Sequence, residues 1–321
     1  MKAIVQNAYG SPDVLEVMEV DRPEVKENEV LVRVVAASIN AGDIFSVKGS
    51  PWLARFSVGF PKPKDYILGW DAAGTVETVG EKVTQFKPGD EVYMLCSGAF
   101  AQFACAPEDS VALKPQSLTY EQAAAFPSGA LTALLALRTQ GKLKEGQKVL
   151  INGASGGVGT FSVQIAKALG AEVTGVCSTR NVDLVRSLGA DHVFDYKKED
   201  FTKSDQRYDL ILDNVGSRSF ADCRRVLTQK GVHLPNTGHG GMSYVIKAYL
   251  LSALMKQHLA PFLAVPGPED FRFLNELIEA GKVKPVIDKI YPMNKAKDAF
   301  WYLENEHAQG KVVITVMENS K

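Results

Sequence analysis

The stretch of sequence that decides the fold reads Lys148-Val149-Leu150-Ile151-Asn152-Gly153-Ala154-Ser155-Gly156-Gly157-Val158-Gly159. A short apolar, β-branched run ends at a glycine cluster, and a helical pattern follows through Gly170. Strand, tight glycine turn and helix in this order begin a dinucleotide-binding fold. The glycines let the backbone approach a pyrophosphate, and the helix N-terminus offers free N–H groups. Alanine takes the first position of the G-x-G-x-x-G pattern. We expect the phosphates to be bound by Ala154, Ser155, Gly156, Gly157, Val158 and Gly159.

Composition and charge exclude several classes of protein. The 321 residues suffice for two domains with full-sized cores, and 45% hydrophobic with 23% charged residues is ordinary for a globular protein. A formal net charge of −1 without a dense Lys/Arg run gives no indication of nucleic-acid binding. No stretch reaches the roughly 18 apolar residues that a membrane-spanning helix needs. Four scattered cysteines, and an N-terminus that starts as a strand without a signal-peptide core, predict a cytoplasmic location.

The first 122 residues are predicted to be rich in β-strands. Short alternating runs recur between turn signals at 3–6, 15–20, 29–36, 73–79, 91–94 and 101–104. Many short strands at this spacing favour a barrel or a sandwich over βαβ units. The segment 41–64 is too rich in turn residues to be a core strand, and we expect it to form a loop over a cleft.

From about residue 120 the pattern changes to alternating helices and strands. Helical periodicity at 121–126 and 130–139 precedes the glycine turn. After it we expect strands at 172–176, 192–195, 208–213, 232–236 and 259–265, with helices at 182–188, 218–228, 242–257 and 271–280. Such alternation predicts a parallel sheet with right-handed crossovers. A last strand at 310–316 has no helix after it, and we expect it to return to the β-rich domain.

Several motifs along the chain are shared with one known family. They are Ser38-Ile39-Asn40-Ala41-Gly42-Asp43, Leu68-Gly69-Trp70-Asp71-Ala72-Ala73-Gly74, Phe86-Lys87-Pro88-Gly89-Asp90-Glu91-Val92, Ser128-Gly129-Ala130-Leu131-Thr132-Ala133, Asn152–Gly159, Ser187-Leu188-Gly189-Ala190-Asp191-His192 and Gly310-Lys311-Val312-Val313. With these motifs the chain resembles, essentially end to end, the medium-chain dehydrogenase/reductase superfamily. Within it, the nearest branch is the zinc-independent quinone oxidoreductases, the zeta-crystallin-like group.

The resemblance implies a fold, an activity and an assembly. The fold is α/β, a Rossmann-type doubly wound parallel sheet joined to a β-rich, GroES-like catalytic domain. We place the GroES-like domain at 1–122 with 290–321, and the dinucleotide-binding domain at 123–289. The implied activity is hydride transfer from NADPH to a quinone or an α,β-unsaturated carbonyl compound. The implied assembly is a homodimer joined across the edge strand expected at 259–265, because an apolar edge favours pairing.

A catalytic zinc ion is not expected. Zinc needs thiolate, imidazole or carboxylate ligands. Where zinc-dependent relatives carry the first cysteine ligand, this chain has Asn40, and where they carry a Gly-His-Glu motif it has Gly69-Trp70-Asp71. The closely spaced four-cysteine lobe is also missing, and we interpret Cys96 and Cys105 as core residues. None of the five histidines falls into a ligand spacing, so we expect no metal site.

The resemblance also assigns residues to the catalytic cleft. It places Asn40 beside the nicotinamide, although this residue could instead cap a turn before Gly42. Asp43 either orients its neighbours or a substrate, or forms an Asx turn. Thr132 lies on the nicotinamide side or packs within a helix. The branch often carries tyrosines soon after the asparagine, and without them no phenolic proton donor is expected here. The aromatic residues expected at the substrate are Phe45, Trp52 and Trp70.

The cofactor preference is read at the end of the second strand of the dinucleotide fold. An NAD-specific fold usually carries a carboxylate there, bonded to the ribose hydroxyl. Here Ser178, Thr179 and Arg180 follow the strand, and these donors suit the 2′-phosphate of NADPH. Alternatively, they form an ordinary helix start. In NADPH-binding relatives a tyrosine after the third strand approaches this phosphate, and Tyr196 matches it. Further cofactor contacts are expected from Asn214, Gly238 and Lys311.

Two alternative functions and one ambiguous segment remain. The activity could be that of a zinc-free alcohol dehydrogenase-like enzyme, or the chain could be a non-catalytic, NADPH-binding structural protein. The apolar segment 242–257 could lie on a membrane surface or pack against the last strands and a partner subunit. Its two lysines are too few for a basic face, which favours packing.

Overall fold

The decisive stretch folds as a strand, a turn and a helix. In the computed structural model of the chain, β8 (Lys148–Asn152) leads through the glycine turn into α5 (Gly159–Ala168). Gly153 has a φ of 78°, a conformation that residues with a Cβ rarely adopt, and this turns the chain sharply out of the strand. The structure describes residues 1–50, 52, 55–63, 66–236, 258–259 and 265–317.

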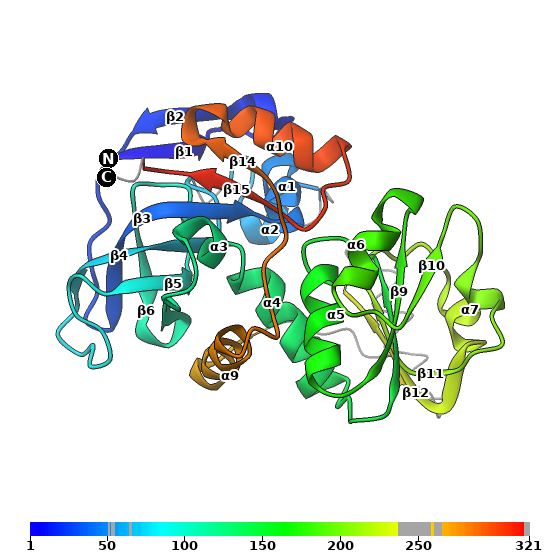
Figure 1. The fold of residues 1–321 in the computed structure, drawn as a ribbon. Helices are drawn as coiled ribbons and strands as arrows, with labels where there is room; N and C mark the ends of the chain where they lie inside the picture. The colour runs from blue at the N-terminus through cyan, green and yellow to red at the C-terminus, as the bar shows by residue number, and fades with distance from the viewer. Residues whose placement is uncertain (51, 53–54, 64–65, 237–257, 260–264, 318–321) are drawn as a thin grey trace. The chain divides into compact units, whose positions relative to one another are not determined.

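Parallel strands form a six-stranded sheet around β8 (Figure 1). Its order is β10-β9-β8-β11-β12-β13, which in chain order is 3-2-1-4-5-6, the order of Rossmann-type sheets. This confirms the predicted parallel sheet. The order reverses between β8 and β11, so the carboxyl ends of these two strands border the crevice where such sheets bind ligands. The other strands are β9 (Glu172–Cys177), β10 (His192–Asp195), β11 (Tyr208–Asp213), β12 (Leu227–Pro235) and β13 (His258–Leu259).

Helices pack on this sheet between its strands. The helices α5 and α6 (Val182–Ser187) contact β8, β9 and β10, while α7 (Phe220–Arg224) contacts β12. The helix expected at 218–228 is wrong in its second half, because α7 ends at Arg224 and β12 already begins at Leu227. Leu227 pairs with Tyr208 of β11, and this long-range pairing overrides the local helical pattern.

A second, mostly antiparallel sheet contains the β-rich part of the chain. Along its path the order is β14-β15-β3-β4-β5-β7, with β6 also paired to β3, while β1 and β2 form a separate antiparallel pair. The last strand pairs antiparallel with β3, which confirms its predicted return to this part. The strands are β1 (Lys2–Gln6), β2 (Leu15–Glu19), β3 (Glu29–Ile39), β4 (Asp71–Val79), β5 (Glu91–Leu95), β6 (Phe103–Pro107), β7 (Val111–Leu113), β14 (Ile287–Pro292) and β15 (Lys311–Thr315).

The segment 41–64, expected to be a loop, contains two short helices, so that expectation is wrong for α1 (Ala41–Lys48) and α2 (Arg55–Val58). Asn40 is the N-cap of α1, and its backbone N–H donates to Asp43 Oδ2 at 2.8 Å. Gly49 ends the helix with a φ of 56°, as C-terminal glycines commonly do. The other helices are α3 (Tyr120–Ala124), α4 (Pro127–Leu134, continued by a π-helical turn at Leu135–Gln140), α9 (Pro268–Glu279) and α10 (Ala296–Asn305).

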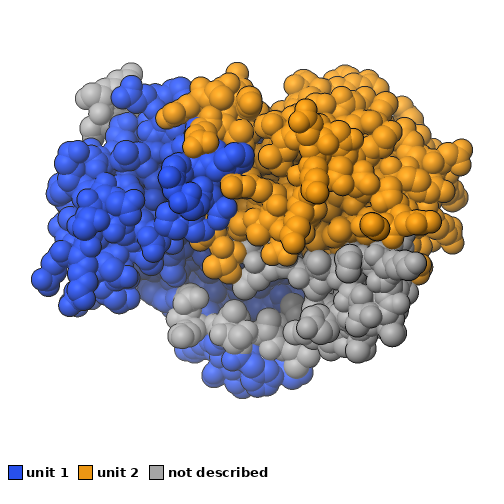
Figure 2. Space-filling view, turned by 90° about the horizontal axis from the view of Figure 1, so that it is seen from below, with its two compact units in different colours: residues 1–129, 267–275, 285–321 blue, residues 130–266, 276–284 orange. Residues whose placement is uncertain are grey.

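The chain divides into two compact units, coloured separately in Figure 2. Unit 1 contains residues 1–129, 267–275 and 285–321, and unit 2 contains residues 130–266 and 276–284. The domain boundaries expected from the sequence, after 122 and after 289, stay a prediction. The helix expected at 242–257 and most of the strand expected at 259–265 lie outside the described residues. In the described ranges, no helix is long and apolar enough to cross a membrane.

We predict that the third glycine of the motif contributes to stability, whereas the second does not. A Cβ at Gly159 would lie 2.0 Å from the carbonyl oxygen of Gly153, so Gly159→Ala forces backbone apart where α5 meets the turn. We expect it to lower the free energy of unfolding by about 2 kcal/mol. A Cβ at Gly156 meets only that oxygen, at 3.5 Å, so the matched Gly156→Ala change should stay within about 0.5 kcal/mol.

Urea unfolding of the two variants beside the unchanged protein measures this difference. Equal stability of Gly159→Ala and Gly156→Ala would contradict the close packing of helix on turn.

Candidate functional site

Polar side chains from four segments of unit 1 converge on Asp71, the first residue of β4. Ser38 lies opposite Asp71 in β3 and donates to Oδ2 at 3.0 Å. Asn40 Nδ2 and Lys311 Nζ each donate to the same oxygen at 3.1 Å. Ser128 in α4 donates to Oδ1 through its backbone N–H at 2.9 Å and through its hydroxyl. We call these five residues the Asp71 cluster.

The Asp71 cluster contains an ion pair that is almost completely removed from solvent. The side chain of Lys311 is 2% exposed and that of Asp71 is 0% exposed. Two charges taken out of water lose several kcal/mol of hydration each, and a pair is retained only where hydrogen bonds satisfy the remaining atoms. Here the carboxylate accepts five hydrogen bonds. Lys311 is one of the residues predicted to contact the cofactor. In the structure its ammonium group is bonded to Asp71 and Asn40.

The cluster fixes which way the Asn40 amide points. Lys311 Nζ, which can only donate, is bonded to Asn40 Oδ1. Asp71 Oδ2, which can only accept when ionised, takes a hydrogen from Asn40 Nδ2. The amide therefore cannot be flipped without placing like groups together. Among the described residues the second hydrogen of Nδ2 has no acceptor, so it can be donated to a ligand. Asn40 is also the N-cap of α1, which agrees with its interpretation as a cap, while its place beside the nicotinamide stays a prediction.

Asp43 lies beside this cluster and is buried in α1, with 1% of its surface exposed. Burial raises the pKa of its carboxyl to about 7, an effect that Asp71 increases and that the Asn40 N–H and Lys311 oppose. Its Oδ2 accepts the Asn40 backbone N–H, whereas Oδ1 has no hydrogen-bond partner among the described residues. Sequence reasoning pointed to Asp43 but not to Asp71, Ser38 or Ser128 as members of a site.

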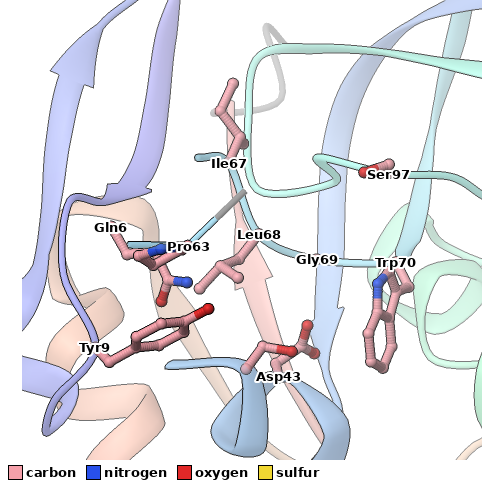
Figure 3. A pocket seen from close by; sticks show the side chains of 10 residues that line it. Gln6, Tyr9, Asp43, Pro63, Ile67, Leu68, Gly69, Trp70 and Ser97 are labelled. Carbon is pink, nitrogen blue, oxygen red and sulfur yellow. The ribbon is translucent and has the colours of Figure 1, made fainter. Parts of the chain in front are cut away.

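Asp43 also borders a cavity of about 80 Å³ within unit 1 (Figure 3). Figure 3 shows its carboxyl group between the Tyr9 ring and the Trp70 indole. The Oε1 of Gln6, another lining residue, is buried and likewise has no partner in the described part of the chain. Of the aromatic residues assigned to the substrate, only Trp70 lines this cavity. The complete lining is Gln6, Tyr9, Asp43, Ser46, Pro63, Ile67, Leu68, Gly69, Trp70 and Ser97.

The other two predicted aromatic residues lie at the surface of unit 1. Phe45 in α1 is 38% exposed and Trp52 is 60% exposed. The Trp52 ring packs edge to face against Phe56 of α2, with ring centroids 5.6 Å apart. An exposed, adaptable aromatic pair of this kind can cover an apolar ligand, and the role of both residues at a substrate stays a prediction.

In unit 2, the glycine turn has the shape that a pyrophosphate needs. A side chain at Gly156 would enter open space except for one backbone oxygen at 3.5 Å, so a ligand can approach the backbone there. Alanine is accepted at the first motif position because its methyl group faces Gly175 of β9. A Cβ added at Gly175 would lie 3.0 Å from the Cβ of Ala154. Ser155 Oγ accepts a hydrogen bond from Asn181 Nδ2 at 2.8 Å. These residues fit a dinucleotide.

The residues assigned to the 2′-phosphate gather at the carboxyl ends of β9 and β10. Asp195 pairs with Cys177, and the Tyr196 backbone N–H donates to the Cys177 carbonyl at 3.0 Å, which puts the half-exposed Tyr196 beside the segment that starts at Ser178. Thr179 Oγ1 donates to Asp195 Oδ2 at 2.7 Å. Its hydroxyl hydrogen is therefore already used within the protein, and the assignment of the 2′-phosphate to Ser178, Thr179, Arg180 and Tyr196 stays a prediction.

Three further predicted cofactor residues have different outcomes. Asn214 follows β11 at the crevice, where its Nδ2 donates to the Asn152 carbonyl at 3.2 Å and its Oδ1 accepts from Asn236 at 2.8 Å. Thr132 is half-buried in α4. Gly238 lies outside the described residues.

We predict a pH-dependent contribution of Asp43 to stability. Its pKa of about 7 in the folded chain lies above its ordinary value of 3.8. The folded state therefore holds a proton that the unfolded chain releases, and stability falls as the pH rises from about 4 to about 7. The loss is at most about 4 kcal/mol. Asp43→Asn keeps the size of the side chain and should remove this part of the pH dependence.

Thermal unfolding between pH 4 and pH 8 measures the effect, with Asp298→Asn, at an exposed position in α10, as the matched control. An Asp43→Asn variant with the same pH dependence as the unchanged protein would show that this carboxyl is already ionised at low pH.

Comparison with known protein families gives two matches. A sequence profile for an alcohol dehydrogenase GroES-like domain matches residues 26–116, and one for a zinc-binding dehydrogenase matches residues 188–314. The first match supports the GroES-like assignment of the β-rich part. The second profile is named for zinc-binding dehydrogenases. Asn40 and Trp70 nevertheless stand where zinc-dependent relatives are expected to carry zinc ligands, and neither is a zinc ligand.

Relatives and solved structures match over nearly the whole chain. The chloroplast envelope quinone oxidoreductase homolog of Arabidopsis thaliana is 37% identical over 332 residues, covering 98% of both chains. The chloroplastic NADPH-dependent alkenal/one oxidoreductase of the same plant is 34% identical, covering 98% of this chain and 79% of the relative. The Coxiella burnetii quinone oxidoreductase superposes with a TM-score of 0.87 at 30% identity over 99% of both chains. For the Escherichia coli quinone oxidoreductase complexed with NADPH the TM-score is 0.83 at 25% identity, over 98% of this chain and 100% of the other. The chain thus belongs to the quinone oxidoreductase-like proteins of the medium-chain dehydrogenase/reductase superfamily.

Proposed function

We propose that the protein is a zinc-independent, NADPH-dependent reductase that transfers hydride to a quinone or an α,β-unsaturated carbonyl compound. The observation that carries the proposal is the Asn40 amide, which the buried Asp71–Lys311 pair holds in one orientation with a spare N–H. The names of the relatives, which include quinone and alkenal/one oxidoreductases, support the class of acceptor. NADPH supplies the hydride when bound. The chain has to bind the cofactor, orient the acceptor and polarise its carbonyl group.

The unused Nδ2 hydrogen of Asn40 suits the carbonyl oxygen of an acceptor. Negative charge develops on that oxygen as hydride reaches the conjugated carbon, and a fixed donor lowers the barrier because it needs no reorganisation. The Lys311 ammonium behind the amide adds positive potential. A carboxyl group with a pKa near 7, such as Asp43, suits the proton that the reduced acceptor must then take up.

The proposed activity is tested by steady-state oxidation of NADPH with a panel of small quinones, enones and enals. We expect turnover that a strong chelator leaves unchanged. Asn40→Ala should lower kcat by about a hundredfold while NADPH affinity stays within a few-fold, because a donor to the transition state is lost. Asn305→Ala, on the exposed face of α10, is the matched control.

The same assay separates the two alternatives. Turnover of simple alcohols and not of conjugated carbonyls would favour the alcohol dehydrogenase-like enzyme. Binding of NADPH without turnover of any acceptor would favour a structural protein, and a fully active Asn40→Ala variant would remove Asn40 from the mechanism.

The preference for NADPH over NADH rests on Arg180 with Ser178 and Tyr196. No carboxylate follows β9 at the position where NAD-specific folds carry one. Asp195, an acidic group close by, accepts a hydrogen bond from Thr179 and lies 3.5 Å from Lys198 Nζ. Charge-assisted hydrogen bonds to a phosphate contribute about 1.5–3 kcal/mol each. Arg180→Ala should therefore weaken NADPH binding by roughly ten- to a hundredfold and change NADH binding little.

Titration of both cofactors against the unchanged protein, Arg180→Ala and the control Arg186→Ala measures this preference. Arg186 lies in α6, with its guanidinium 3.8 Å from Asp183 Oδ1, so its removal controls for the loss of a positive charge in the segment that follows β9. Equal affinities for the two cofactors would mean that the segment from Ser178 to Arg180 does not recognise the 2′-phosphate. An Arg180→Ala variant that binds both cofactors equally more weakly would mean the same.

We further propose a homodimer and a cytoplasmic location. The strand β13 ends the six-stranded sheet, and an edge strand offers backbone groups to a partner. The four cysteines are free, as is usual in a reducing compartment.

A further inference from the structure

A buried group of three chemically reactive side chains lies in unit 2, between the six-stranded sheet and α7. Asp213 ends β11, His233 lies in β12, and Cys223 lies in α7. In the parallel register His233 pairs with Ile211, so it shares a sheet face with Asp213, two residues on. One ligand atom from each of the three side chains lies within 4.8 Å of the others. The exposed fractions of Asp213, Cys223 and His233 are 1%, 0% and 0%.

Three side-chain polar atoms of this group have no hydrogen-bond partner among the described residues. Neither ring nitrogen of His233 has a partner among the described residues, and neither has Asp213 Oδ2. The other carboxylate oxygen, Oδ1, is fully used. It accepts Asn152 Nδ2 at 2.8 Å and the backbone N–H groups of Val215 and Gly216 at 3.1 and 2.8 Å. Those bonds hold the carboxylate with Oδ2 facing His233, and carboxylates that bind metals are usually held by hydrogen bonds in the same way.

Two explanations compete for these buried atoms. In the first, a protonated His233 forms an ion pair with Asp213. Their atoms are 3.5 Å apart, whereas charge-assisted N–H···O bonds are about 2.7–2.9 Å long, and the second imidazolium N–H would still be buried without a partner. In the second, one cation binds both residues. A nitrogen and an oxygen on the same tetrahedral zinc ion are about 3.4 Å apart, so the observed 3.5 Å fits this geometry.

We propose that Asp213, Cys223 and His233 bind a divalent transition-metal ion of the zinc class. Thiolate, imidazole and carboxylate together are the donor set that Zn²⁺ accepts, and hard cations such as Mg²⁺ would not take the thiolate. The surroundings are apolar, with the Phe220 ring lying parallel to the His233 imidazole at a centroid distance of 5.7 Å. A water molecule can supply the fourth ligand.

This site is separate from the zinc positions of the family. Those positions are held here by Asn40 and Trp70 in unit 1, and their lack of ligands was the reason to expect no metal. The ion proposed here joins α7 to β11 and β12, so its role is structural. It also bears on the cofactor crevice, because Asp213 bonds to Asn152 at the end of β8 and precedes Asn214. The proposal does not depend on the proposed reductase activity.

The test is the metal content and optical spectrum of the full chain produced in zinc- or cobalt-supplemented medium. We expect about one ion per chain by elemental analysis. With cobalt, we expect the near-ultraviolet charge-transfer band of a thiolate–Co²⁺ bond together with tetrahedral visible bands. Cys223→Ser should abolish the charge-transfer band, and His233→Asn should reduce the metal content at least tenfold. Cys177→Ser is the matched control, since Cys177 is also a buried, free cysteine of unit 2.

The spectrum of the unchanged protein decides the matter even if a variant fails to fold. Background metal content, or bound cobalt without the thiolate band, would overturn the proposal and leave the ion pair as the explanation. Equal spectra for Cys223→Ser and Cys177→Ser would overturn it as well, because the metal would then be bound elsewhere.

Discussion

The buried charge pair of Asp71 and Lys311 is the constraint on which unit 1 depends. It joins the first residues of β4 and β15, which lie 240 positions apart in the chain. Removing one partner would leave an isolated charge in the interior, which typically costs 3–5 kcal/mol, whereas an apolar pair of similar size could fold equally well. Stability alone therefore does not explain the pair. Its specific effect is on Asn40, whose amide has one allowed orientation because a cation lies at one end and a carboxylate at the other.

A different constraint organises unit 2, namely the close approach of backbone to backbone at the glycine turn. Gly159 has no room for a side chain, while Gly156 borders open space. Within one motif, Gly159 thus allows close backbone packing, and Gly156 leaves space for a ligand. The substitution of alanine at the first motif position is compatible with this arrangement, because Gly175 in the neighbouring strand leaves room for the Ala154 methyl group. The alanine in the turn after β8 and the glycine in β9 therefore compensate each other in size.

The parts of the fold that the sequence predicted are those with local signals. The strands at 192–195 and 208–213 have the predicted bounds. For 208–213 the reason is that a buried parallel strand is a nearly continuous apolar run between turn residues. The two errors have different causes. Leu227 joins β12 because the distant Tyr208 pairs with it, whereas α1 forms in a segment rich in turn residues because of a local cap between Asn40 and Asp43. The site shows the same division. The motif pointed to Asn40, but nothing local indicates that Asp71 and Lys311 meet beside it.

The Asp213 group cannot be recognised from the spacing of residues in the sequence. Histidines and cysteines at short, regular intervals indicate a metal site only when one helix or turn supplies several ligands. Here each residue comes from a different element, and only the crossover through α7 brings Cys223 against the two strands. The hydrogen bonding of Asp213 differs from that of Asp71, the buried carboxylate of unit 1. In unit 1 the chain satisfies a buried carboxylate with five hydrogen bonds. In unit 2, one oxygen of Asp213 accepts three hydrogen bonds, whereas the other faces the His233 imidazole and has no partner within the described part of the chain. Because unsatisfied buried groups are costly, this asymmetry is itself evidence that Oδ2 and the imidazole share a third participant.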